Sequence, residues 1–267
     1  MYRAYWNMEF DPFSKEIDMK KLFKTNDFNE ALTRLEFLNT TKGIGLFTGN
    51  PGSGKTYAIK YFLDNLNPNL YKVVYLPLTT ISVMDFYQAL AICLGLETGR
   101  SKTKLFFDIQ NYIKQLVQEQ KKNLVIAIDE AQLLSKEILT DLKILFNFDM
   151  DSKNMATLIL IGLPVINHTL SKRIFEDLNQ RIVMKYDFAG IAESDVRLYI
   201  TDRLNLANAN CNIFDDNSIV ALASACNGSL RKLNLIITRA LTIGATIKVQ
   251  TINSDIIMKA VNDINLI

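Results

Sequence analysis

Short apolar runs alternate along the chain with longer segments in which apolar residues recur at helical spacing. Five runs rich in β-branched residues predict strands at residues 44–48, 72–76, 123–128, 157–161 and 181–186. Between them, the apolar spacing predicts helices at residues 29–40, 57–66, 82–94, 105–120 and 136–146. Ser82 and Asp85 form a capping-box pair at the start of the third of these helices. The alternation predicts an α/β fold with a parallel sheet.

The pattern changes near residue 193, where the strand-like runs stop. From there, glycines and Asp or Asn caps separate four amphipathic segments, which predict helices at residues 193–207, 217–226, 230–245 and 255–264. The first 24 residues include EFDPFSK and predict an irregular arm that packs aromatic side chains on the rest of the protein. We therefore predict two domains, an arm with an α/β core over residues 1–190 and a helical lid over residues 191–267.

Composition narrows the class of protein. The 267 residues are 49% hydrophobic, which is enough for a sizeable core in one domain or in one domain plus a small one. Thirty basic and 28 acidic residues give a net charge of +2, so any nucleic-acid contact must come from local clustering of charge. His168 is the single histidine, which makes histidine-rich metal sites and a Ser-His-Asp triad poor candidates.

The chain also shows no signal for membrane insertion or export. Its longest apolar run, residues 158–166, is far too short to span a bilayer and contains a proline. No apolar stretch of signal-peptide type follows Arg3. Three widely spaced cysteines, Cys93, Cys211 and Cys226, are expected to be free thiols. We expect a soluble cytoplasmic protein without a membrane partner.

A glycine-rich segment carries the first chemical signal. Gly49, Gly54, Lys55 and Thr56 match G-x-x-x-x-G-K-[ST], the phosphate-binding loop, between a predicted strand and a predicted helix. Glycines let successive backbone N–H groups point at one anion, helped by the helix N-terminus. Lys55 would reach the β- and γ-phosphates of ATP, and the Thr56 hydroxyl would ligate Mg²⁺. The alternative is a glycine-rich turn that ends in Lys-Thr by chance. The predicted nucleotide-binding residues of this segment are Asn50, Pro51, Gly52, Ser53, Gly54, Lys55, Thr56 and Tyr57.

The predicted strand LVIAIDE ends in two acids. Asp129 at its tip would hold the magnesium shell together with Thr56, and Glu130 would face a water that attacks the γ-phosphate. The D-x-x-G and N-K-x-D motifs of GTPases do not occur in a suitable place. The pair therefore favours hydrolysis of ATP by water. The alternative is a helix N-cap aspartate followed by a first-turn glutamate, which can coexist with catalysis.

Two arginines extend the pattern. Arg181 begins the fifth predicted strand, where it suits an arginine finger that points into the phosphates of a neighbouring subunit. Arg231 lies near the start of the third lid helix, where it suits an arginine that closes over the nucleotide. A solvent-exposed charge is the alternative for each arginine taken alone.

Seven segments together resemble the AAA+ ATPases of the ExeA type, a group close to transposition regulators such as TniB, TnsC and MuB. They are EFDPFS, GNPGSGKT, IAIDEAQLL, LILIGLP, LNQRI, YITDRLNLA and GSLRKLN, and they cover nearly the whole chain. The resemblance implies a P-loop AAA+ core with a five-stranded parallel sheet, a small helical lid, and assembly into rings or filaments around DNA. It also implies nucleotide and Mg²⁺ contacts for Lys55 and Thr56.

The same resemblance implies roles for the acids and arginines. Asp129 and Glu130 would be the metal-binding and catalytic acids, and Arg231 the lid sensor. Arg181 would be the finger, with Arg173 in reserve. One departure is Leu163, which stands where the family usually shows a polar residue after the fourth strand. Slow hydrolysis of ATP is the expected consequence.

Three functions fit the resemblance. We favour a DNA-bound ATPase that forms a homo-oligomer and recruits or activates a transposase. The second is a helper ATPase of secretion, and the third a nucleotide-gated scaffold with little turnover. The secretion members look longer than this chain, with a membrane span and a wall-binding module that the sequence does not show, which is why we rank them second.

The DNA hypothesis rests on a short basic loop. In the transposition regulators, loops at similar positions touch the phosphate backbone. Lysine and hydroxyl groups suit contacts with double-stranded DNA that ignore its sequence. The alternative is a solvated loop. The candidate DNA-binding residues are Thr79, Thr80, Arg100, Lys102 and Lys104.

Overall fold

The computed structural model describes residues 2–14, 23–77, 82–148 and 154–265 of the chain, and its described residues fall into two compact units. The α/β unit comprises residues 30–49 and 55–188, and the helical unit comprises residues 1–29, 50–54 and 189–267. The division after residue 188 lies close to the predicted one at residue 190. The described residues of the N-terminal arm, however, group with the helices, whereas the predicted division places the arm in the core domain.

Five parallel strands form the sheet of the α/β unit, in the order β2-β3-β4-β1-β5. They are β1 (Gly43–Gly49), β2 (Tyr71–Pro77), β3 (Asn123–Asp129), β4 (Ala156–Gly162) and β5 (Ile182–Phe188). Each corresponds to one predicted strand, and the predicted α/β architecture is confirmed. Since all strands are parallel, their carboxyl ends meet at one edge of the sheet and their amino ends at the other.

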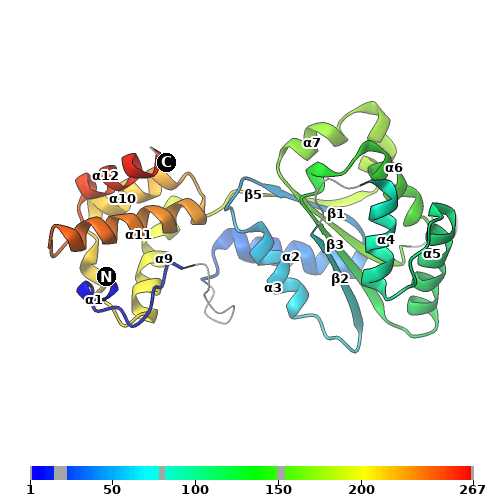
Figure 1. The fold of residues 1–267 in the computed structure, drawn as a ribbon, viewed down its shortest axis with the longest axis horizontal. Helices are drawn as coiled ribbons and strands as arrows, with labels where there is room; N and C mark the ends of the chain where they lie inside the picture. The colour runs from blue at the N-terminus through cyan, green and yellow to red at the C-terminus, as the bar shows by residue number, and fades with distance from the viewer. Residues whose placement is uncertain (1, 15–22, 78–81, 149–153, 266–267) are drawn as a thin grey trace. The chain divides into compact units, whose positions relative to one another are not determined.

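Helices cover both faces of this sheet (Figure 1). On one face, Ile44 and Leu46 pack in a core with α4 (Val83–Leu94), α5 (Lys102–Gln118) and α6 (Lys136–Leu145). On the other lie α2 (Asn26–Thr41) and α3 (Lys55–Asp64). A Cβ on Gly45 would lie 2.3 Å from Leu38 Cδ2, so α2 packs directly against the backbone of β1. Burial on both faces explains why β1 and β4 are apolar runs without alternation.

Local signals fix several helix ends. The predicted capping box of α4 is present, with the Asp85 N–H donating to Ser82 Oγ and the Ser82 N–H to the Asp85 carboxylate. Three short helices between β4 and β5 were not predicted, because none is long enough to show helical periodicity. They are α7 (Val165–Leu170), η4 (Arg173–Phe175) and α8 (Glu176–Gln180).

The helical unit packs around its own apolar core. Trp6 and Phe13 of the arm are buried in this core, and Trp6 Nε1 donates to the Leu241 carbonyl at 2.9 Å. No helix in the described part of the chain is long and apolar enough to cross a membrane. The helices of the unit are α1 (Tyr2–Tyr5), α9 (Glu193–Leu206), η5 (Cys211–Ile213), α10 (Asp216–Cys226), α11 (Leu230–Thr246) and α12 (Ser254–Asn265).

Candidate active site

The glycine-rich segment forms the turn between β1 and α3, and α3 begins at Lys55. Gly52 and Gly54 adopt φ angles of +81° and +96°, which side-chain-bearing residues rarely adopt. Lys55 is 9% exposed, and its Nζ donates to the Gly49 carbonyl at 2.6 Å. The Ser53 hydroxyl is buried, and among the residues that the structure describes it has no hydrogen-bond partner. A buried ammonium, an unpaired hydroxyl and a helix N-terminus in one turn suit the binding of an anion.

The two predicted metal ligands meet at the carboxyl edge of the sheet. Asp129 is the last residue of β3 and is 9% exposed. The Thr56 Oγ lies 3.4 Å from its Oδ2, although 73 positions separate the two residues in sequence. Tyr75 on β2 donates its hydroxyl hydrogen to the same Oδ2 at 2.6 Å, and the Glu130 N–H donates to Oδ1 at 2.8 Å. Tyr75 was not among the predicted site residues, and it reaches Asp129 because β2 pairs with β3.

Glu130 leaves β3 in a left-handed conformation, with φ +53° and ψ +37°. Such backbone is unfavourable for a residue with a side chain by roughly 1–2 kcal/mol. The element that follows is a 3₁₀ turn, η2 (Ala131–Leu133), whose N-cap position is Glu130 and has no side-chain capping bond. The alternative hypothesis of an Asp129 N-cap therefore does not describe the local structure. The Glu130 side chain is exposed at the carboxyl edge of the sheet.

Gln132 is a second contact residue that was not predicted from the sequence. Its Nε2 donates to Glu130 Oε2 at 2.5 Å, and its Oε1 accepts a hydrogen bond from the Leu163 N–H at 2.9 Å. Leu163 follows β4 directly, so Gln132 ties the end of β4 to the acid that follows β3. A Cβ on Gly162 would lie 2.6 Å from Gln132 Oε1, so a glycine is needed there for this close approach. Leu163 thus contributes a backbone N–H where its side chain offers no polar group.

Within the helical unit, residues 50–54 of the turn are held on the start of α11. The Leu230 N–H donates to the Gly52 carbonyl at 3.0 Å, and Ser229 Oγ donates to the Pro51 carbonyl at 3.2 Å. Ser229 is also the N-cap of α11, where its Oγ accepts from the Lys232 N–H at 3.3 Å. Arg231 is exposed in the first turn of that helix. A Cβ on Gly52 would lie 2.9 Å from Arg231 Cβ, so the predicted arginine is a direct neighbour of the turn.

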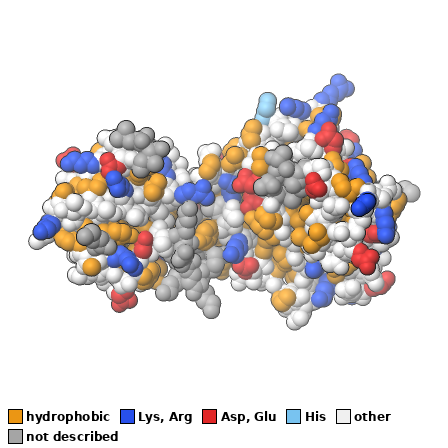
Figure 2. Space-filling model, in the orientation of Figure 1, with side chains coloured by type: hydrophobic (Ala, Val, Ile, Leu, Met, Phe, Trp, Pro, Cys, Tyr) orange, Lys and Arg blue, Asp and Glu red, His pale blue; other side chains and the backbone are white. Residues whose placement is uncertain are grey.

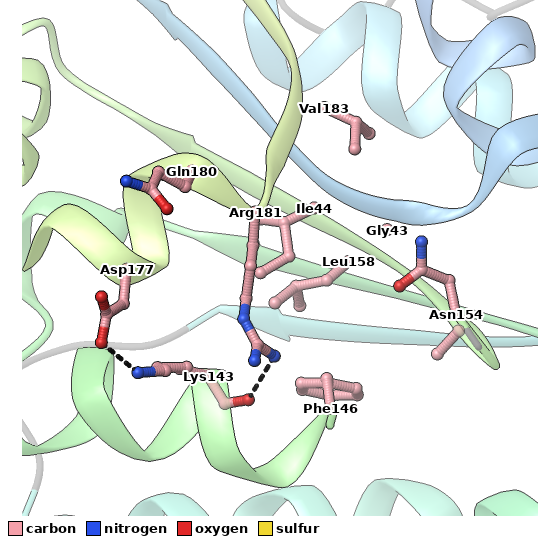
Figure 3. Close-up of a pocket in the computed structure, with 11 residues that line it drawn as sticks. Gly43, Ile44, Lys143, Phe146, Asn154, Leu158, Asp177, Gln180, Arg181 and Val183 are labelled. Atoms are coloured by element: carbon pink, nitrogen blue, oxygen red, sulfur yellow. Dashed lines mark hydrogen bonds and ion pairs between the residues drawn. The ribbon is translucent and has the colours of Figure 1, made fainter. Parts of the chain in front are cut away.

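Arg181 lies at the opposite, amino edge of the sheet, one residue before β5. It lines a pocket of about 520 Å³, where one of its N–H groups donates to the Lys143 carbonyl at 3.1 Å (Figure 3). Lys143 also forms an ion pair with Asp177. A strand of seven residues such as β1 is about 20 Å long at roughly 3.3 Å per residue, so Arg181 cannot reach Asp129 of its own chain. Arg173 is exposed on η4.

The candidate DNA-binding residues differ in their surroundings. Thr79 and Thr80 lie outside the described residues. All three basic residues are exposed, Arg100 two positions before α5 and Lys102 and Lys104 in its first turn. Lys102 instead forms an ion pair of 2.5 Å with Asp141, a carboxylate with only 14% side-chain exposure, and lies 5.6 Å from the centre of the Tyr87 ring. On the face shown in Figure 2, basic and acidic side chains are interspersed, in line with the small net charge.

Sequence comparison identifies the domain. Residues 38–170 match the family model described as AAA domain. The chain is 30% identical over 246 residues to general secretion pathway protein A of Aeromonas hydrophila, which covers 90% of this chain but 44% of that protein. It therefore spans less than half of that relative. It is 24% identical over 270 residues to ATP-dependent target DNA activator B of Escherichia phage D108, covering 98% of this chain and 79% of the phage protein.

Solved structures share the fold. Cdc6p from Pyrobaculum aerophilum superposes with a TM-score of 0.67 at 15% identity, covering 90% of this chain and 67% of that one. The Drosophila ORC bound to DNA gives a TM-score of 0.67 at 16% identity, covering 97% of this chain and 64% of that one. At such identities the likeness concerns the fold alone. Together with the match to the AAA domain, the five-stranded parallel core followed by a helical segment places this chain among the AAA+ ATPases.

Proposed function

We propose that this protein binds ATP with Mg²⁺, hydrolyses the ATP, and uses the cycle to act on a partner protein. The observation that carries the proposal is the 3.4 Å approach of Thr56 to Asp129, from segments far apart in sequence. A hydroxyl beside a carboxylate at the strand end is the donor set that Mg²⁺ uses when nucleotide phosphates complete its shell. No group of three or more His, Cys, Asp or Glu side chains among the described residues could hold a metal by itself.

In this proposal each residue of the turn has a distinct task. Lys55 exchanges the Gly49 carbonyl for phosphate oxygens, and the N–H groups at the start of α3 hold the same anion. Thr56 and Asp129 hold Mg²⁺, which neutralises the charge that develops on the phosphates. Tyr75 keeps the Asp129 carboxylate in place through its hydroxyl. Glu130 accepts a proton from the attacking water, because it is the exposed acid next to Asp129.

Paired substitutions in the same helix test the proposal. Lys55→Ala should weaken ATP binding in calorimetric titration by 10-fold or more, because a charge-assisted contact is worth roughly 1.5–3 kcal/mol. Lys60→Ala, at an exposed position of α3, is the matched control and should bind ATP as the wild type does. Glu130→Gln should bind ATP normally and lose turnover. Wild-type affinity in Lys55→Ala, or wild-type turnover in Glu130→Gln, would refute the assignment.

We further propose that Arg181 completes the site of a neighbouring subunit in a homo-oligomer. Its place at the amino edge supports an action in trans, since its own acids lie about 20 Å away along the strands. Arg231 would sense the nucleotide from the helical unit, beside Gly52. Arg181→Ala should bind ATP without hydrolysing it, and mixing it with Lys55→Ala should restore some turnover. Absence of rescue at every mixing ratio would favour Arg173 or a monomeric enzyme.

We propose that the partner protein on which the ATP cycle acts belongs to a secretion pathway. The similarity to general secretion pathway protein A supports this because it reaches 30% identity over 90% of the chain. Secretion is therefore ranked above transposition, which reverses the preference drawn from the sequence. Three free cysteines suit a reducing cytoplasm, where we place the protein. Replacing the gene in its host by one encoding Glu130→Gln should leave exported proteins inside the cell. Normal export would refute this role.

A second candidate is a DNA-bound ATPase that recruits or activates a transposase. The similarity to target DNA activator B over 98% of the chain favours it, as do the exposed Arg100 and Lys104. ATP-dependent binding should then weaken steeply with salt, equally on two unrelated duplexes, in fluorescence anisotropy. Changing Arg100 and Lys104 to Ala should flatten the salt slope. Lys102→Ala is the control and should leave the slope nearly unchanged, because the Lys102 ammonium is paired with Asp141 and does not neutralise a phosphate. If the wild-type protein does not bind DNA under any condition, the function as a DNA-bound ATPase is excluded.

A further inference from the structure

A side chain bridge joins the proposed base to the neighbouring strand. Gln132 contacts Glu130 with one end of its carboxamide and the Leu163 N–H with the other, at 2.5 Å and 2.9 Å. Its backbone is fixed by η2, in which the Leu133 N–H donates to the Glu130 carbonyl at 2.8 Å. The bridge therefore starts from the 3₁₀ turn η2 and ends at Leu163, the first residue after the central strand β4.

The chemistry of the two partners allows one orientation of the carboxamide. A backbone N–H can only donate, so Leu163 requires an acceptor, which is Oε1 of Gln132. An ionised carboxylate can only accept, so Glu130 requires a donor, which is Nε2. A carboxamide offers both, on two separate atoms of one planar group. Glutamate at this position would satisfy Leu163 but would bring a second carboxylate to Glu130.

The bridge uses one oxygen of Glu130 and leaves the other available. Oε2 accepts from Gln132, and within the described part of the chain Oε1 has no hydrogen-bond partner. Because Glu130 is exposed, its side chain would otherwise sample several rotamers. A hydrogen bond to one oxygen restricts that freedom, and the free oxygen can then face a single position.

We propose that Gln132 is a positioning residue, which holds the Glu130 carboxylate against the end of β4 so that its free oxygen faces the attacking water. This inference rests on the proposed hydrolysis of ATP. Displacement of a reacting group by about 1 Å can lower a rate by roughly 100-fold. Loss of the bridge should therefore lower turnover by about 10- to 100-fold and leave ATP affinity within about twofold of the wild type.

Three variants separate the two halves of the bridge. Gln132→Ala removes both contacts, so it should lose turnover and also expose the Leu163 N–H to faster hydrogen exchange. Gln132→Glu keeps an acceptor for Leu163, so exchange should stay slow while turnover falls. Its two neighbouring carboxylates compete for protons, and the acid limb of its pH–turnover profile should move to higher pH. Gln118→Ala, at an exposed position of α5, is the control and should change neither measurement.

A fourth variant reaches the bridge from the other side. Gly162→Ala should reproduce Gln132→Ala, because its Cβ would occupy the space of Gln132 Oε1, at 2.6 Å. Circular dichroism checks that both variants fold. Wild-type turnover in Gln132→Ala, or unchanged Leu163 exchange in it, overturns the inference while leaving ATP hydrolysis intact. A wild-type protein that binds ATP without hydrolysing it refutes the proposed function first, and the inference with it.

Discussion

Alanine substitutions at three glycines can measure how much the contact between the phosphate-binding turn and α11 contributes to the free energy of unfolding. Gly52, Gly54 and Gly99 differ in two respects, their backbone conformation and the space around them. Gly52 has φ +81°, and a Cβ there would lie 2.3 Å from Ser229 Oγ and 2.9 Å from Arg231 Cβ. Gly54 has φ +96° with nothing within 4 Å of such a Cβ, and Gly99 is open without a positive φ. Alanine at the three positions therefore separates strain from contact.

The expected costs follow from this difference. Gly99→Ala should be near neutral, and Gly54→Ala should cost about 1–2 kcal/mol of unfolding free energy for the left-handed backbone alone. Gly52→Ala carries the same strain and also displaces Ser229 Oγ, which breaks the α11 N-cap, at about 1 kcal/mol. It breaks the hydrogen bond to the Pro51 carbonyl too, at about 1 kcal/mol. The total for Gly52→Ala is about 3–4 kcal/mol.

Urea unfolding of nucleotide-free protein, followed by circular dichroism, compares the three variants without any effect of phosphate binding. The decisive quantity is the difference between Gly52→Ala and Gly54→Ala, expected at about 2 kcal/mol. The double variant Gly52→Ala with Ser229→Ala should cost less than the sum of its parts, because the contact is lost only once. Equal costs for Gly52→Ala and Gly54→Ala would show that the turn gains no stability from α11.

Two further predictions concern titration. Burial, and next the hydrogen bond to Asp129, raise the pKa of Tyr75 above its ordinary value. The stabilisation that the neutral hydroxyl provides is complete below about pH 10 and is lost above it. In urea unfolding, the unfolding free energy of the wild type should therefore exceed that of Tyr75→Phe by about 1 kcal/mol. This difference should be constant from pH 7 to 9 and should shrink above pH 10. The Lys143 ammonium, through its hydrogen bond and its charge, holds the pKa of Asp177 below its ordinary value. Its stabilisation is present above about pH 4 and lost as pH falls further, so the small difference in Tm between wild type and Asp177→Asn should vanish in acid. A difference that persists at pH 2 would contradict this.

Much of the candidate site was predictable because its signals are local. The phosphate-binding turn is a contiguous motif, and the position of Asp129 at a strand end follows from the apolar run before it. Their meeting at one edge follows from the rule that carboxyl ends of parallel strands lie together. The capping box of α4 likewise depends on two residues three positions apart.

The contacts that were not predictable join residues far apart in the chain. Gln132 lies in a visible motif, but its second partner, Leu163, is 31 positions away and offers only a backbone group. Lys102 looked like its basic neighbours, and its ion pair with Asp141 depends on how α5 and α6 pack. Aromatic residues of the arm predicted burial, but composition does not specify which core receives them.

The separation of Arg181 from Asp129 on one sheet restricts how copies of this chain can combine. If the proposed arginine acts across a head-to-tail contact, the amino edge of one copy meets the carboxyl edge of the next, and the contact is heterologous. A two-fold pair would instead need both edges of each copy, about 20 Å apart along the strands, within one shared interface. An open row of n chains would hold n − 1 complete sites, with one unserved site at one end and one idle arginine at the other. Closure of such a head-to-tail row into a ring makes the number of complete sites equal to the number of chains, so the specific activity of a row should depend on its length.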